Sequence, residues 1–211
     1  PLGIIPLGTA NVLATELGYP RHSSALAALL MAGKTQSVFL ASVQTENHRR
    51  LFSCMASAGF DAQVVAHISS RLKKMLGKSA YIYTAIKLLF RLKQPEIKVE
   101  IDGVPVEQPV YGVIACKARH YGGKFVLAQE ASLNAASFDV IVIHKKGRMA
   151  LLKLALALGL GRVQALPFTA TYTAKTLTCH TTAPEPLQTD GDVGGKTPCK
   201  ITIHPQPFHF L

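Results

Sequence analysis

A turn of small residues near the start of the chain could bind phosphate. Residues 6–11 read PLGTAN and lead directly into a helical pattern over 11–17. The free N–H groups of a first helical turn, together with the hydroxyl of Thr9, can hold an anion. The same residues also suit an ordinary helix start, with Thr9 or Asn11 as the cap and Gly18 as the stop. Such a phosphate turn normally follows a strand and almost nothing precedes it here, so we expect the later part of a larger protein.

The periodicity of apolar residues predicts the elements that must position this turn. We expect helices over 11–17, 23–32, 62–76, 80–92 and 149–158. Ser23 or Ser24 would cap the second helix, and Asp61 the third. We expect strands over 36–44, 51–58, 97–101, 104–106, 111–118, 125–128, 138–143, 169–179, 186–189 and 200–204. Without parallel βαβ units after residue 35, this pattern predicts an α+β fold, mainly an antiparallel β domain with helical insertions.

Composition and charge narrow the classes of partner. The 211 residues are 48% hydrophobic and 17% charged, which indicates a globular chain, and the formal net charge of +11 indicates an anionic partner. Basic residues gather beside apolar ones between Asp61 and Glu96 and again at 145–153. That pattern fits a membrane surface better than nucleic acid, and a solvated helix face is an equal alternative. The four cysteines show no CxxC spacing, so we expect reduced thiols in a cytosolic protein.

Four short patterns follow one another along the chain. They are PLGTANVLA with LGYP at 6–20, AGFDA at 58–62, ARHYGG with FDV at 118–140, and LQTDGD with TP at 187–198. In this order and spacing they resemble the diacylglycerol kinase/sphingosine kinase family of lipid kinases, particularly the soluble bacterial members. The resemblance covers nearly the whole chain and favours nucleotide contact over simple capping for residues 6–11.

The resemblance implies two domains with a cleft between them. Residues 1–34 would be the end of an N-terminal α/β nucleotide-binding domain. Residues 35–211 would form a C-terminal domain, mainly an antiparallel β-sandwich with helical insertions, that shapes the lipid site. The family's glycine-rich GGDGT nucleotide motif would lie upstream of Pro1, so we expect this fragment alone to be inactive.

The resemblance also assigns roles to individual residues. Gly8, Thr9 and Asn11 would contact the nucleotide, with Asn11 shaping the turn. Asp192 falls on the acid that accepts the proton of the lipid hydroxyl, where the family has the longer Glu. Asp190 would orient this acid or help to ligate metal. Asp61 would either approach the lipid substrate or cap a helix, and we expect the cap.

Two departures from the family pattern stand out. Val12 replaces an acid in the first motif. The family also binds Mg²⁺ through an Asp side chain and two backbone carbonyls, at positions that fall on Ser132, Ala135 and Ser137. Because Ala135 supplies no carboxylate, and two carbonyls are a poor Mg²⁺ shell, we expect this metal site to be lost or weak.

The implied function is transfer of the γ-phosphoryl group of ATP, with Mg²⁺, to a hydroxyl of a lipid such as diacylglycerol, a sphingoid base or phosphatidylglycerol, in phospholipid biosynthesis. The implied partners are the lipid substrate and an anionic membrane surface, with no nucleic acid, at a cytoplasmic and peripherally membrane-associated location. A homodimer is left open. The main alternative is a non-catalytic lipid- or membrane-binding relative, and a third is a small-molecule kinase akin to NAD kinases.

Overall fold

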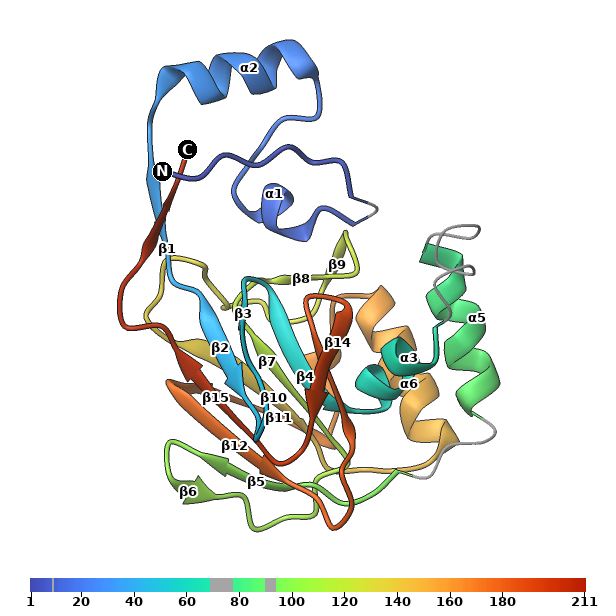
Figure 1. Cartoon of the computed structure of the whole chain (residues 1–211). Coiled ribbons are helices and arrows are strands. Elements are labelled where there is room, and N and C mark those ends of the chain that lie inside the picture. The colour runs from blue at the N-terminus through green and yellow to red at the C-terminus, as the bar shows by residue number, and fades with distance from the viewer. Residues whose placement is uncertain (9, 69–77, 90–93) are drawn as a thin grey trace.

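Two antiparallel sheets packed face to face form the body of the molecule (Figure 1). The computed structural model describes residues 1–8, 10–68, 78–89 and 94–211. The first sheet has the order β11-β10-β7-β4-β13-β14, with bounds Thr169–Ala174, Phe138–Ile143, Gly112–Cys116, Met55–Gly59, Pro186–Thr189 and Asp192–Lys196. The second has the order β3-β2-β15-β12-β5-β6, with bounds Arg49–Phe52, Ala41–Gln44, Cys199–Ile203, Thr176–His180, Lys98–Ile101 and Val104–Pro105. The predicted fold class is confirmed.

The main core lies between the two sheets. Every second residue of β10 points into it, and Phe138, Val140 and Val142 are at most 2% exposed. They meet residues of the opposite sheet such as Val43 and Leu177. Burial of each such side chain contributes about 1.5–3 kcal/mol, so this layer fixes the register of the sheets.

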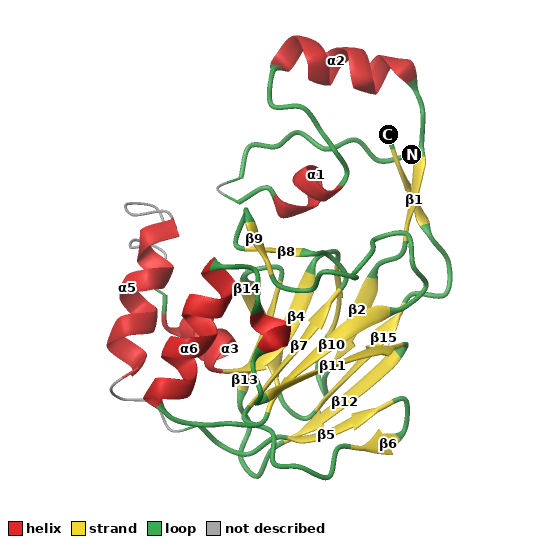
Figure 2. Cartoon of the chain, turned by 180° about the vertical axis from the view of Figure 1, so that it is seen from behind, coloured by secondary structure: helices red, strands yellow, loops and turns green. Residues whose placement is uncertain are grey.

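Helices cover the outer face of the first sheet, as Figure 2 shows. They are α3 (Phe60–His67), α5 (Lys78–Leu89) and α6 (Arg148–Gly159), followed by the short helix η1 (Val163–Ala165). Under them lies a second cluster that includes Met55, Ile114, Ile141 and Ala157. Because β10 is covered on both faces, all six of its residues are buried, and five of the six, all but Asp139, are apolar.

The first 38 residues and the last four pack together at one end of the sandwich (Figure 1). Helices α1 (Val12–Glu16) and α2 (Ser23–Ala32) precede β1 (Gln36–Val38), which pairs with β16 (Phe208–Phe210). A short hairpin, β8 (His120–Tyr121) with β9 (Phe125–Val126), lies under α1. Whether residues 1–34 and 35–211 act as two domains stays a prediction.

Several boundaries differ from those expected. The strand expected over 36–44 is divided into β1 and β2, and that over 169–179 into β11 and β12, because in each case the chain passes from one sheet to another. The residues over 51–58 likewise supply the end of β3 and most of β4, so only the first part pairs with β2. Neither Ser23 nor Ser24 caps α2: the N-cap position is His22, without a side-chain hydrogen bond. The helix expected over 62–76 ends as α3 at His67, where Ile68 is extended, and residues 69–76 and the expected helix end at 92 lie outside the described residues.

Candidate functional site

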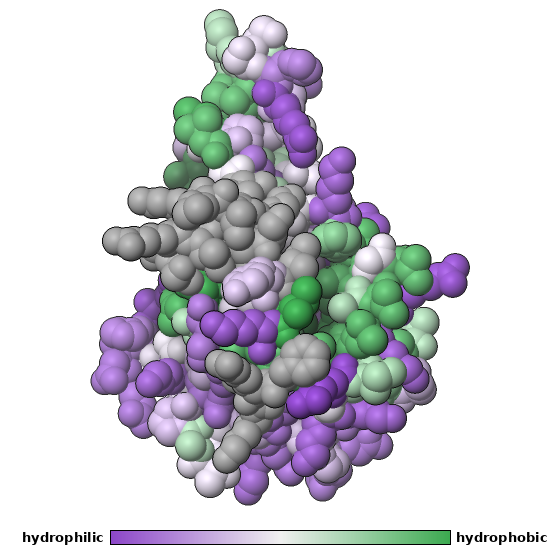
Figure 3. Space-filling model, turned by 90° about the vertical axis from the view of Figure 1, so that its right-hand side faces the viewer, coloured by the Kyte–Doolittle hydropathy of each residue, from purple (hydrophilic) through white to green (hydrophobic). Residues whose placement is uncertain are grey.

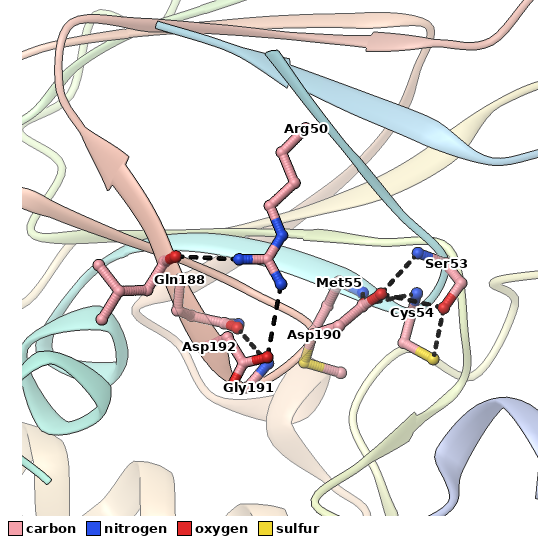
Figure 4. Close-up of polar contacts among 9 residues, drawn as sticks. Arg50, Ser53, Cys54, Met55, Gln188, Asp190, Gly191 and Asp192 are labelled. Carbon is pink, nitrogen blue, oxygen red and sulfur yellow. Dashed lines mark hydrogen bonds and ion pairs between the residues drawn. The ribbon is translucent and has the colours of Figure 1, made fainter. Parts of the chain in front are cut away.

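The predicted acids lie at the β13–β14 hairpin, with Asp190 in the turn and Asp192 at the start of β14 (Figure 4). Asp190 and Gly191 have φ angles of 51° and 85°, which is the left-handed pair that a tight type I′ hairpin requires. The Asp190 carboxylate accepts hydrogen bonds from the backbone N–H groups of Ser53, Cys54 and Met55, at 2.8, 2.8 and 2.9 Å. It also accepts one from the Ser53 hydroxyl at 3.0 Å. Four donors fill its acceptor sites, so this geometry favours the orienting role over metal ligation.

Asp192 begins β14 and is exposed beyond this clamped turn. Its Oδ2 lies 3.4 Å from Nη2 of Arg50, whose Nη1 donates to the carbonyl of Val193 at 3.1 Å. The two side chains are 57% and 43% exposed, so solvent weakens the ion pair. Arg50 therefore orients the carboxylate more than it stabilises the fold.

Helix α1 is attached to the β8–β9 hairpin by a charged contact. Oε1 of Glu16 accepts hydrogen bonds from the backbone N–H of His120 at 2.7 Å and lies 2.7 Å from Nδ1 of the same residue. Glu16 is the better buried partner, with a side chain 9% exposed. The first and third sequence patterns are thus held together directly.

Asp61 links the second and third patterns. One carboxylate oxygen accepts the Ser57 hydroxyl at 2.6 Å, and the other accepts the hydroxyl of Tyr121 on β8. The expectation that Asp61 caps the helix is wrong, because the N-cap of α3 is Gly59 and no side chain bonds there. One oxygen of the carboxylate therefore ties α3 to the hairpin, and the other ties it to β4.

The predicted nucleotide turn is shaped by Asn11. Its side-chain Nδ2 donates to the carbonyl of Pro6 at 2.9 Å, and its backbone is left-handed with a φ of 48°. A Cβ on Gly8 would lie 2.9 Å from Asn11 Oδ1, so a larger residue at position 8 would displace the Asn11 side chain. Asn11 does not cap α1 through its side chain, whereas Gly18 ends the helix as expected, at a φ of 73°. Thr9 lies outside the described residues.

The expected magnesium loop is centred on a lysine. Nζ of Lys117 donates to the backbone carbonyls of Ser132, Ala135 and Ser137 at 2.9, 2.6 and 2.8 Å. These are the three positions on which the family resemblance places a metal site. Lys117 is fully buried, and burial lowers its pKa to about 8, which leaves the ammonium charged at neutral pH. Mg²⁺ therefore does not fit at these carbonyls while the ammonium is present.

All these groups lie at one end of the sandwich. Figures 1 and 2 agree in placing the β13–β14 turn, the β8–β9 hairpin and the turn before α1 on this end. Within the described part of the chain, no three His, Cys, Asp or Glu side chains gather as a metal site. The arrangement therefore places the exposed carboxylate of Asp192 at the same end of the sandwich as the glycine-containing turn that precedes α1 (Figure 1).

Comparison with known proteins decides the family. The model of the YegS C-terminal NAD kinase beta sandwich-like domain matches residues 54–211, and that of the diacylglycerol kinase catalytic domain matches residues 1–43. The chain belongs to this family of YegS-like and diacylglycerol kinases. The family predicted from the four sequence patterns is therefore confirmed.

Individual relatives are similar to this chain in sequence and in fold. It is 34% identical over 143 residues to a probable lipid kinase YegS-like from Pseudomonas putida, covering 67% of this chain and 46% of that protein. It is 28% identical over 217 residues to a diacylglycerol kinase from Mycobacterium tuberculosis, covering 100% and 69%. The crystal structure of a putative diacylglycerol kinase from Bacillus anthracis superposes with a TM-score of 0.76 at 21% identity, covering 99% and 67%. The chain spans about half the length of the Pseudomonas relative.

Three charged residues that contact the candidate site in the structure were not identified from the sequence. Lys117 is a lone charge at the end of an apolar run, a pattern that signals a buried lysine with partners. Glu16 and Arg50 had no such signal, because their partners are about a hundred residues or more away along the chain.

Proposed function

We propose that the protein is an ATP-dependent lipid kinase that transfers the γ-phosphoryl group to a lipid hydroxyl such as that of diacylglycerol. The observation that carries the proposal is the clamped β13–β14 turn, which holds Asp192 exposed at the same end of the sandwich as the turn before α1. Membership of a family whose relatives are named lipid and diacylglycerol kinases supports the reaction class.

In the proposed step the lipid hydroxyl oxygen attacks the γ-phosphorus of ATP. A new P–O bond forms, the bond to the bridging β–γ oxygen breaks, and ADP leaves. The hydroxyl proton passes to the carboxylate of Asp192, which Arg50 orients. Gly8 and Asn11 shape the helix start that would meet the nucleotide phosphates. The Mg²⁺ that accompanies ATP would neutralise phosphate charge.

A solvent-facing apolar strip on α6 supports access to a membrane. Met149, Leu152, Leu156 and Leu160 recur along one side of this helix and its end, and are 46–74% exposed. Figure 3 shows apolar surface gathered on the side of the molecule that carries α5 and α6. Arg148 and Lys153 add positive charge that suits an anionic lipid surface. Among the described residues no helix is long and apolar enough to cross a bilayer.

The kinase proposal is tested with the full-length protein, labelled ATP and diacylglycerol in mixed micelles. We expect labelled phosphatidic acid from the wild type, and a loss of about 10²- to 10⁴-fold in kcat with Asp192→Asn. Asp192→Glu, which lengthens the acid, should retain activity. Glu107→Gln, an equal change at an exposed acid after β6, is the matched control and should leave the rate unchanged. Equal turnover by wild type and Asp192→Asn would remove Asp192 as the base.

A second function is favoured by three departures from the family pattern, at Val12, Ala135 and Asp192, and by the formal net charge of +11. It is a non-catalytic module that binds lipid or membrane. Vesicles of phosphatidylglycerol and phosphatidylcholine would then sediment the protein although no lipid is phosphorylated. Leu156→Asp should weaken sedimentation, whereas Val104→Asp on β6, with a side chain 67% exposed, should not.

A further inference from the structure

Three backbone carbonyls of one loop converge on a single buried charge. The loop runs from Ser132 to Ser137, and its carbonyls at 132, 135 and 137 all accept from Nζ of Lys117. An ammonium has three N–H donors, and each has one acceptor here. Lys117 itself has no exposed surface. This is a saturated cation site in which the cation belongs to the chain.

The contact lengths identify the occupant of the loop. The three N···O distances of 2.6–2.9 Å are those of charge-assisted hydrogen bonds. Mg²⁺ would need oxygens at about 2.0–2.1 Å and Ca²⁺ at about 2.3–2.6 Å, with six or more ligands. No carboxylate comes from position 135, which is alanine. The nearby Asp139 instead supplies negative charge that favours the ammonium.

We propose that the Lys117 ammonium is the permanent cation of the 132–137 loop, replacing a divalent metal there and making the order of this loop independent of Mg²⁺. Geometry carries this inference: a fully buried lysine, three convergent carbonyls and a missing carboxylate. It goes beyond the proposed function, because it concerns which ion holds the loop whether or not the protein is a kinase.

Lys117 lies between the β13–β14 turn, which carries Asp190, and the N-terminal segment. Its backbone N–H donates to the carbonyl of Cys54 at 2.8 Å, and the N–H of Cys54 is one of the donors to Asp190. On the other side, the carbonyl of Leu133 accepts from the N–H of Phe39 at 2.8 Å, and the Leu133 side chain packs with α1. The ammonium thus fixes the loop against both halves of the candidate site.

The test measures thermal unfolding of the full-length protein, without nucleotide, in EDTA and across a titration of MgCl₂ or CaCl₂. Lys117→Ala leaves three carbonyls around a space, so its Tm in EDTA should fall by roughly 10 °C. Added divalent cation should change the Tm of the wild type and of Lys117→Ala little, because three carbonyls without a carboxylate are a poor Mg²⁺ shell, whereas a double variant that also carries Ala135→Asp should gain about 5 °C more than the wild type. Lys98→Ala, at an exposed lysine of β5, is the control and should respond as the wild type does.

Lys117→Met keeps the proposal testable if the alanine variant does not fold. Its uncharged chain fills the same space, so it should be less stable than the wild type and gain nothing extra from divalent cations. The double variant Lys117→Ala with Ala135→Asp should respond to Mg²⁺ most strongly, since it supplies the absent carboxylate. Equal stability of Lys117→Met and wild type, or the same Mg²⁺ response in the double variant and wild type, would overturn the proposal.

Discussion

Asp190 and Asp192 are two residues apart, yet their contacts indicate different roles, one in the stability of the turn and one in activity. Asp190 is clamped by four hydrogen bonds, whereas Asp192 has an exposed ion pair. We predict that Asp190→Asn loses stability and Asp192→Asn loses activity. Comparing the two variants separates a residue that holds the turn from one that acts on the substrate.

The magnitude for Asp190→Asn follows from its bonds. Asparagine also favours the left-handed backbone of this turn, so the change leaves the turn conformation undisturbed. Its amide oxygen can still accept from Cys54 and Met55, but its NH₂ group faces the N–H of Ser53, which loses its acceptor. A hydrogen bond to a charged group is worth about 1.5–3 kcal/mol, and water can reach Ser53, so the loss should be about 1–2 kcal/mol. Asp192→Asn should cost at most about 1 kcal/mol.

Urea denaturation of both variants at pH 7, together with the lipid kinase assay, tests this reasoning. The free energy of unfolding should fall for Asp190→Asn, and kcat should fall most for Asp192→Asn. An Asp190→Asn variant as stable as the wild type but inactive would refute the structural role and indicate that Asp190 acts on the reactants. A large loss of stability in Asp192→Asn would refute the view of its ion pair as weak.

Three further predictions concern other parts of the fold. Glu16→Ala removes both contacts to His120 and should lower the free energy of unfolding by about 1–3 kcal/mol, seen as a lower urea midpoint; an unchanged midpoint would mean that the contact does not hold α1. Gly59→Ala should cost more than about 3 kcal/mol, because its Cβ would lie 2.9 Å from the backbone of both Tyr111 and Gly112 and its φ of 111° and ψ of −149° suit only glycine. Gly103→Ala, at a φ of 82° with open space around it, should cost only about 1 kcal/mol, and similar losses at the two sites would contradict this reasoning. Burial raises the pKa of Asp139, so ionising it in the fold is unfavourable and stability decreases as pH rises from the ordinary Asp pKa through the raised value. Asp139→Asn should therefore gain more over the wild type at pH 7 than at pH 4 in urea titrations, and the reverse order would disprove the assignment.

The sequence predicted local elements well where one signal was sufficient. The bounds of α2, β10 and β13 agree with expectation because apolar periodicity and turn residues such as Gly33 mark their ends. The strand expected at 169–179 was divided, since no local signal shows that the chain changes sheets at Lys175. The order of the four patterns was sufficient to identify the family.

The candidate site was predicted less completely, because its contacts join residues far apart in sequence. Asp61 had two plausible roles on sequence grounds, and only its approach to Tyr121 shows that it is not a cap. Ala135 predicts a metal site that is lost or weak for want of a carboxylate, and this stays a prediction. The apolar run before Lys117 signals that this lysine is buried, but its three partners could not be inferred, because backbone carbonyls leave no trace in side-chain identity.

The apolar cluster under α1 limits how the molecule can move. Leu17 and Tyr19 pack there with Val38, Leu133 and the C-terminal Phe210, and the Tyr19 hydroxyl also donates to the carbonyl of Leu211. A hinge between α1 and the sandwich would have to open this cluster and break the β1–β16 pairing. If the protein closes around a nucleotide, α1 therefore travels with the sandwich as one rigid body, and the bending must occur elsewhere in the chain.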